Sequence, residues 1–189
     1  MGNQGMTPQR IAIVGTSGSG KTTLAQQVGR RLGMAHIELD ALHWEADWVA
    51  APPEVFRARV ATALKGDRWV TDGNYSRVRD LVWQRADTVV WLDYPLVLVL
   101  WRSLRRALWR SFTGVELWNG NRETWQQTFF SGDSVLLWTL RTYHRRRREY
   151  PLLLAQPESV HLNVARVRSP WQAQRWLANL ESHSDSQND

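Results

Sequence analysis

The chain has no cysteine, and this absence excludes disulfide bonds, thiolate metal sites and cysteine nucleophiles. It also lacks an apolar signal-peptide core, because residues 1–7 are polar. The longest apolar run, residues 89–101, contains Asp93 and Pro95 and is too short to span a bilayer. We therefore expect a cytoplasmic protein with no membrane partner. Its 189 residues are enough for one domain with a sizeable core.

Lysine is almost missing as well, since the chain has only Lys21 and Lys65 against 22 arginines. Arginine presents a planar fork, whereas lysine is a compact point charge on a flexible stem. The net charge of +6 is also uneven, because residues 95–150 hold ten arginines and only four acidic residues. A local excess of positive charge indicates a site rather than a generally basic surface.

One stretch has the pattern of a phosphate-binding loop. Residues 11–14 are typical of a buried strand, residues 15–20 of a glycine-rich turn, and residues 22–32 of a helix. In the pattern G-x-x-x-x-G-K-[ST], backbone N–H groups surround a phosphate and the helix N-terminus adds its dipole. Lys21 can reach the β- and γ-phosphates and the Thr22 hydroxyl can ligate Mg²⁺, whereas the alternative is an ordinary Gly/Ser turn. The residues expected to bind the nucleotide are Gly15, Thr16, Ser17, Gly18, Ser19, Gly20, Lys21, Thr22 and Thr23.

The rest of the chain alternates short apolar strands with helices. Further strands are expected at 36–39, 69–71, 88–92 and 160–164, and further helices at 53–65, 78–85, 96–110, 133–149 and 170–180. Their uninterrupted apolar character favours burial on both faces. This pattern predicts an α/β fold of three layers, with a five-stranded parallel sheet and helices on both faces. We expect a single domain over residues 1–181 and a disordered tail over 182–189.

Aspartates follow three of the predicted strands, at the sheet edge where ligands bind in such folds. Asp72 and Asp93 are alternative carboxylates for holding Mg²⁺, and the local pattern does not separate them. Asp40 is a candidate acceptor of the proton from a substrate hydroxyl, with helix capping as the alternative. His43 has no partner at metal-ligand spacing, so we interpret it only as a potential substrate contact.

Two sets of arginines flank a segment rich in helix breakers, residues 112–133. The sets are Arg102, Arg105 and Arg106 on one helix, and Arg141, Arg145 and Arg148 on the next. This arrangement predicts a lid that is open without nucleotide and closes to bring guanidinium groups to the γ-phosphate. The alternative is a solvated basic face, which we prefer for Arg146 and Arg147.

Taken together, these residues resemble adenylate-kinase-like P-loop kinases. The stretches Asp40-Ala-Leu-His-Trp44, Asp72-Gly-Asn-Tyr75 and Asn119-Gly-Asn-Arg-Glu123 are similar to the bacterial proteins called DNA topology modulation proteins. The resemblance implies the strand order 2-3-1-4-5 and favours Asp72 over Asp93 for Mg²⁺. It also implies Arg102 or Arg106 near the adenine and phosphates, and Arg145 or Arg148 at the transferred group.

The activity implied by the resemblance is an ATP- and Mg²⁺-dependent phosphotransferase acting on a nucleotide or a small hydroxyl-bearing molecule. Residues 40–43 lack the arginine with which adenylate kinases bind the acceptor phosphate, and are in this respect more similar to shikimate and gluconate kinases. The rival hypothesis is a nucleotide-dependent regulatory ATPase that contacts nucleic acid, which would need outward-facing arginines. The expected catalytic residues are Lys21, Asp40, Asp72, Arg102, Arg106, Arg145 and Arg148.

Overall fold

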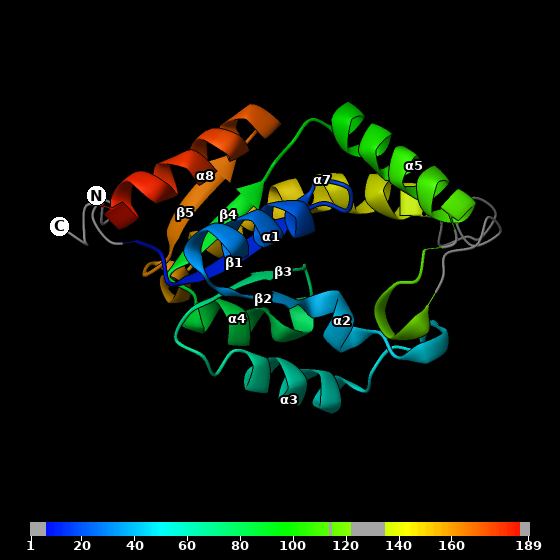
Figure 1. Cartoon of the computed structure of the whole chain (residues 1–189), viewed down its shortest axis with the longest axis horizontal. Helices are drawn as coiled ribbons and strands as arrows, with labels where there is room; N and C mark the ends of the chain where they lie inside the picture. Colours follow the sequence, from blue (N-terminus) through cyan, green and yellow to red (C-terminus); the bar gives the residue numbers. More distant parts are fainter. Residues whose placement is uncertain (1–6, 114, 122–134, 186–189) are drawn as a thin grey trace.

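The computed structural model describes residues 7–113, 115–121 and 135–185, and a five-stranded parallel sheet forms its centre (Figure 1). The strands are β1 (Arg10–Gly15), β2 (Ala35–Glu38), β3 (Trp69–Asp72), β4 (Thr88–Leu92) and β5 (Asn163–Val167). Their order, β2-β3-β1-β4-β5, confirms the expected topology. The register pairs Gly15 with Leu92 and Ile13 with Asp72, so the carboxyl ends of β1, β3 and β4 lie at one edge of the sheet.

Helices cover both faces of this sheet. They are α1 (Lys21–Leu32), α2 (Leu39–His43), α3 (Pro53–Ala63), α4 (Arg79–Arg85), α5 (Leu96–Thr113), α7 (Val135–Leu154) and α8 (Pro170–Asp185), with 3₁₀ turns at Ala46–Trp48, Ser76–Val78, Trp118–Gly120 and Pro157–Ser159. Alternate residues of β1 enter two cores, as the two-residue period of a strand requires. Ile11 and Ile13 pack with α1 and α8, whereas Ala12 and Val14 pack with α3, α4 and the end of α7. None of the helices within the described ranges is both long and apolar enough to cross a membrane.

Two expected helix boundaries are present. Gly33 follows α1 in the left-handed conformation, at φ 60° and ψ 39°, and so ends that helix. The backbone N–H of Gln172 donates to Ser169 Oγ at 3.2 Å, which caps α8 directly before Pro170. The N-terminal cap expected for α7 at residues 133–134 lies outside the described residues.

Several predicted boundaries are wrong. Helix α7 continues through Pro151 to Leu154, because a proline in the last turn removes only one helical hydrogen bond. Strand β5 begins at Asn163 rather than at residue 160, since residues 157–159 form a 3₁₀ turn. Helix α5 runs on to Thr113, into the segment predicted as the lid. Helix α8 likewise reaches Asp185, so residues 182–185 of the predicted tail are helical, and 186–189 lie outside the described residues.

Candidate active site

The loop between β1 and α1 lies directly against α5. Gly18 has a φ of +78°, and a Cβ added there would lie 2.1 Å from Ser103 Oγ and 2.8 Å from the Val99 carbonyl oxygen. Gly20, at φ +92°, precedes the first residue of α1. Both positions need a conformation that residues with a side chain rarely adopt. The local sequence therefore folds into a tight loop whose backbone leads into a helix N-terminus, as phosphate binding requires.

Two arginines of α5 reach this loop. Arg102 donates from Nη1 to the Ser19 carbonyl oxygen at 3.3 Å, and Arg106 donates from Nη2 to Ser17 Oγ at 3.0 Å. Their spacing of four residues puts them on one helix face. Arg105, which was grouped with them, is exposed instead. The structure thus brings Arg102 and Arg106, but not Arg105, to the phosphate loop.

Lys21 is held over the same loop. Its Nζ donates to the Thr16 carbonyl oxygen at 3.3 Å. Burial, and then the neighbouring charge of Arg146, lower the pKa of Lys21 from 10.5 to about 8, against the opposing effect of Asp72 and Asp40. The ammonium group therefore stands among other cations, an environment that a polyanion would stabilise.

Asp72, at the end of β3, faces the first turn of α1. The Thr22 hydroxyl donates to Asp72 Oδ2 at 2.5 Å, and His36 Nε2 lies 2.9 Å from Asp72 Oδ1. A hydroxyl and a carboxylate are the oxygen ligands that suit Mg²⁺. The described residues contain no group of three or more His, Cys, Asp or Glu able to hold a metal ion. Thr22 and Asp72 supply oxygen donors of the kind that hold Mg²⁺, whose remaining ligands are usually water and nucleotide oxygens.

Asp93, at the end of β4, has a different environment. Its carboxylate lies 2.6 Å from Arg166 Nη2 and 2.9 Å from Arg147 Nε. The Arg166 guanidinium also stacks over Trp91, at 4.4 Å from the ring centroid. Asp93 is therefore neutralised by two arginines, and the Asp72 carboxylate is the one placed beside Thr22.

Asp40 was expected at the end of a strand but lies in the first turn of α2. It does not make a side-chain cap for that helix; its Oδ1 accepts a hydrogen bond from the Tyr75 hydroxyl at 2.5 Å. Burial and the charge of Asp40 raise the pKa of Tyr75, so Tyr75 remains a donor. His43 is buried between the rings of Phe56 and Tyr75, and desolvation lowers its pKa. This places His43 in a packed aromatic cluster rather than on an open surface.

Residues 115–121 of the predicted lid lie across the segment that follows α2. Trp118 donates from Nε1 to Glu38 Oε2 at 2.7 Å. Asn121 donates to the Glu45 carbonyl oxygen at 2.7 Å and accepts from the Trp48 backbone N–H at 2.8 Å. The Asn-Gly-Asn motif thus joins two segments that are about 75 residues apart in the chain. Residues 122–133 of the predicted lid lie outside the described residues.

The α7 arginines that were expected at the transferred group lie on the exposed side of that helix. Arg145 and Arg148 are exposed, as is Arg141, and Arg145 Nε lies only 3.5 Å from Glu149 of the same helix. Arg146 is instead half-buried and close enough to Lys21 to lower its pKa. The buried residues of α7 include Tyr143 and Tyr150, and Arg146 lies three residues after one and four before the other. Arg147 lies four residues after Tyr143 and three before Tyr150 and is exposed, so this spacing alone could not have selected Arg146.

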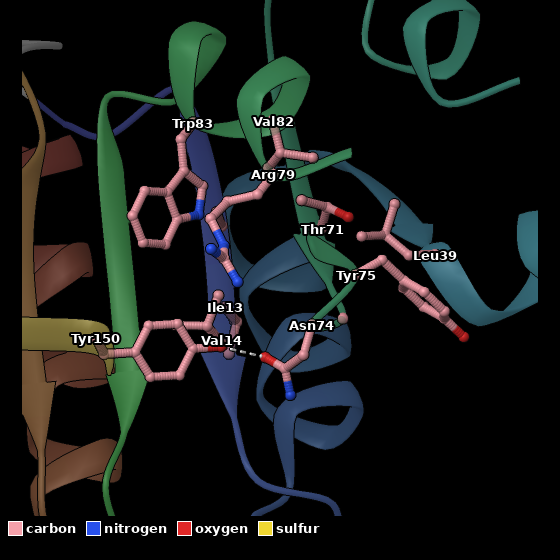
Figure 2. A pocket seen from close by; sticks show the side chains of 12 residues that line it. Ile13, Val14, Leu39, Thr71, Asn74, Tyr75, Arg79, Val82, Trp83 and Tyr150 are labelled. Atoms are coloured by element: carbon pink, nitrogen blue, oxygen red, sulfur yellow. Dashed lines mark hydrogen bonds between the residues drawn. The ribbon is translucent and has the colours of Figure 1, made fainter. Parts of the chain in front are cut away.

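Two more residues were missed, and both touch the nucleotide loop or its carboxylate. One is His36, whose Nε2 contacts the Asp72 carboxylate. The available signal was the two-residue period of the strand, which puts His36 on the same face as Glu38. The other is Asn74, whose amide exchanges hydrogen bonds with the backbone N–H and carbonyl of Gly15. Asn74 Oδ1 also accepts from the Tyr150 hydroxyl at 2.8 Å (Figure 2). These contacts depend on tertiary packing and carry little local signal.

Two of three comparisons with known proteins give matches. A comparison with curated proteins gives no match. Among solved structures, the shikimate kinase of Bacteroides thetaiotaomicron is similar at a TM-score of 0.54 and 15% identity, over 94% of this chain and 99% of that one. A gluconokinase of Sinorhizobium meliloti 1021 is similar at 0.51 and 20% identity, over 97% and 99%. The shikimate kinase of Acinetobacter baumannii in complex with shikimate is similar at 0.54 and 19% identity, over 93% and 94%.

The sheet order and these likenesses assign the fold of the P-loop kinases. A family description, "AAA domain", matches residues 11–113, which are more than half of the 189 residues. The match spans β1 with its phosphate loop, Asp72 and the loop-facing arginines of α5. The chain therefore belongs to this AAA domain family of P-loop proteins.

Proposed function

We propose that the protein is an ATP- and Mg²⁺-dependent kinase that phosphorylates a hydroxyl group of a small molecule or nucleotide. The observation that carries this proposal is the hydrogen bond from Thr22 to Asp72 beside Lys21, at the carboxyl edge of the sheet. Family membership and the fold of the solved kinases support it. We further propose that the chain forms a single cytoplasmic domain related to the DNA topology modulation proteins, and that this domain includes the whole of α8 to Asp185.

In the proposed reaction the loop N–H groups, Lys21 and Arg106 bind the phosphates and hold the γ-phosphorus in place. Thr22 and Asp72 would hold Mg²⁺, which neutralises phosphate charge when bound. The acceptor oxygen bonds to the γ-phosphorus as the bond from that phosphorus to the ADP oxygen breaks, and the acceptor proton passes to Asp40. The Tyr75 hydroxyl orients Asp40 through one carboxylate oxygen, which supports the other oxygen as the proton acceptor.

Arg146 replaces Arg145 and Arg148 in this proposal as the arginine of α7 that acts on the transferred group. Its half-buried position near Lys21 supports the role. A guanidinium that meets charge developing on the γ-phosphoryl group stabilises the transition state more than the ground state. Arg102 acts from the other side of the loop, where it binds the Ser19 carbonyl.

The test is Lys21→Ala beside a matched control, Lys65→Ala, which removes the only other lysine from an exposed position. ATP consumption is measured against nucleoside monophosphates, sugars and sugar acids, and ATP binding by calorimetry. We expect Lys21→Ala to abolish both, with an unchanged melting temperature, and Lys65→Ala to change neither. Wild-type ATP turnover in Lys21→Ala would refute the kinase proposal.

One observation favours the nucleic-acid hypothesis. Arg141, Arg145 and Arg148 are exposed along α7, so this stripe is available to a polyanion. Binding to a DNA duplex should then weaken steeply with salt, and the triple Gln variant should reduce the salt slope by about three. A slope unaffected by the triple substitution would remove this candidate.

A further inference from the structure

His36, in strand β2, contacts the proposed metal carboxylate, although no step of the proposed reaction uses it. Its ring nitrogen Nε2 lies 2.9 Å from Asp72 Oδ1. Both side chains are mostly buried, with exposed fractions of 16% and 6%. A carboxylate only accepts hydrogen bonds, so Nε2 must carry the hydrogen in this contact. The contact is therefore a hydrogen bond from His36 to a mostly buried carboxylate, and such bonds are stronger than those between neutral groups.

The sheet register explains why His36 reaches this carboxylate. Strands β2 and β3 run parallel, with Glu38 paired to Asp72 and His36 paired to Val70. Side chains alternate along a strand, so His36 and Glu38 lie on one face of the sheet. Val70 packs in the core beneath α1, so this face is the one that α1 covers. His36 therefore reaches Asp72 diagonally across two strands, on the side of the sheet where α1 begins.

The same register puts two carboxylates next to each other, those of Glu38 and Asp72. Like charges at paired positions of neighbouring strands destabilise a sheet. Each carboxylate accepts a hydrogen bond from its own donor, because Trp118 Nε1 donates to Glu38 Oε2 at 2.7 Å and His36 donates to Asp72. His36 Nδ1 lies 3.7 Å from Glu38 Oε1, which is beyond hydrogen-bond distance. The His36 ring thus stands between the two carboxylates, and its hydrogen bond is to Asp72.

Asp72 has one donor for each of its carboxylate oxygens. The Thr22 hydroxyl donates to Oδ2 at 2.5 Å, and His36 donates to Oδ1. A hydroxyl that gives its hydrogen to a carboxylate keeps its oxygen lone pairs for another partner, which here is the proposed metal. The terminal torsion of an aspartate is broad, so the side chain alone does not fix the direction of its oxygens. The hydrogen bond from His36 restricts the rotation that would turn Oδ2 away from Thr22.

We propose that His36 is a positioning residue for the Mg²⁺–nucleotide site. By holding Oδ1 it keeps Oδ2 of Asp72 on the Thr22 hydroxyl, and so keeps the Thr22 oxygen directed at the metal. The inference rests on the proposed function, in which Thr22 and Asp72 would hold Mg²⁺. His36 itself supplies neither a metal ligand nor a proton to the reaction. We expect it to set how strongly Mg²⁺ enhances nucleotide binding, and to leave binding of the nucleotide by the loop itself unchanged.

The test is calorimetric binding of a non-hydrolysable ATP analogue, measured once with Mg²⁺ and once with EDTA. His36→Ala should weaken binding by about 10-fold or more in Mg²⁺ and by less than about twofold in EDTA. His36→Gln offers an amide N–H in place of Nε2–H and should restore most of the enhancement by Mg²⁺. Equal affinities of the wild type and His36→Ala in Mg²⁺ would overturn the proposal. So would equal losses with and without Mg²⁺, or a His36→Gln variant no better than His36→Ala.

The matched control is His161→Ala. His161 is exposed, and its Nε2 lies 3.0 Å from the Trp83 carbonyl oxygen rather than from a carboxylate. This variant should change the affinity for the analogue in neither condition. A loss of Mg²⁺ enhancement in His161→Ala equal to that in His36→Ala would overturn the proposal.

A double-mutant cycle separates positioning from a purely structural role. If His36 acts through Asp72, His36→Ala should have little further effect on the Mg²⁺ enhancement once Asp72→Asn is present, because the carboxylate that His36 positions is already gone. Additive losses in the double variant would contradict action through Asp72. Melting curves of the four proteins establish that each is folded at the temperature of the titrations.

Failure of the two proposals can be told apart. Retained ATP turnover in Lys21→Ala would refute the kinase function, while the titrations with and without Mg²⁺ would still report on His36. Where turnover is found, His36→Ala should raise the Mg²⁺ concentration that gives half the maximal rate and leave the KM for the phosphate acceptor unchanged. A rise in the KM for the acceptor alone would contradict the positioning role.

Discussion

Asp72 and Asp93 lie in different surroundings, so replacing each by asparagine should have different effects. Asp72→Asn should lower ATP turnover, whereas Asp93→Asn should lower stability. Asp72→Asn keeps an oxygen that can accept from Thr22 and an amide beside His36. We therefore expect its free energy of unfolding to change by less than about 1 kcal/mol. The loss of charge beside Thr22 should misplace the metal and lower the rate of ATP turnover by about 100-fold or more.

Asp93→Asn acts on stability instead. The carboxylate is 1% exposed and contacts Arg147 and Arg166, whose side chains are 45% and 36% exposed. A hydrogen bond to a charged group contributes about 1.5–3 kcal/mol, and water replaces part of it at such partly exposed arginines. We therefore expect a loss of about 2–3 kcal/mol, which lowers the melting temperature by about 4–12 °C in a chain of this size.

The assay is thermal melting together with ATP turnover in saturating Mg²⁺, at a temperature well below both melting transitions. Asp72→Asn should melt within about 4 °C of the wild type and be nearly inactive. Asp93→Asn should melt early, yet remain active per folded molecule. A larger loss of turnover in Asp93→Asn than in Asp72→Asn would refute the reasoning and transfer the metal role to Asp93.

Four further predictions follow from the same geometry. Arg146→Gln should lower the ATP turnover rate by about 100-fold, because the half-buried Arg146 lies near Lys21. The control, Arg148→Gln at an exposed position, should change the rate less than twofold. Similar losses in the two variants would contradict the role proposed for Arg146. The affinity for ATP should fall as the pH rises through 8, because Lys21, with its pKa lowered to about 8, loses its charge there. Calorimetry in buffers of different ionisation enthalpy should detect proton uptake on ATP binding. If the pH dependence of the affinity persists in Lys21→Met, Lys21 is not its cause. The same lowered pKa means that the unfolded chain binds more protons between about pH 8 and 10.5, so the free energy of unfolding should rise across that window in the wild type and not in Lys21→Met. Gly18→Ala should destabilise the protein by at least about 2 kcal/mol, because Gly18 has a left-handed φ and an added Cβ would lie 2.8 Å from the Val99 carbonyl oxygen. The control, Gly66→Ala, should not destabilise it, because an added Cβ there meets nothing within 4 Å. Equal denaturant midpoints for the two variants would refute the close packing of the loop on α5.

The sequence by itself determined the features that depend on neighbours in the chain. The phosphate loop is one, because glycine conformations, a helix start and a lysine within eight residues are all local properties. The alternation of strands and helices is another, and it predicted a parallel sheet whose order the structure confirms. Helical spacing also placed Arg102 and Arg106 on one face, together with Arg105, and the first two reach the loop.

Only the tertiary structure decided which charged groups meet. Asp72 and Asp93 look alike locally, and they differ because Thr22 and His36 face one while Arg147 and Arg166 face the other. These partners come from strands and helices distant in the chain, so no local pattern records them.

The arginines of α7 make the same point. Helical spacing defines several faces of that helix, but which face is buried depends on where the helix crosses the sheet. Tyr143 and Tyr150 anchor it so that Arg146 turns inward and Arg145 and Arg148 turn outward. Electrostatic interactions act through space and fall off over a few ångströms, so the charges that matter are those the fold brings together.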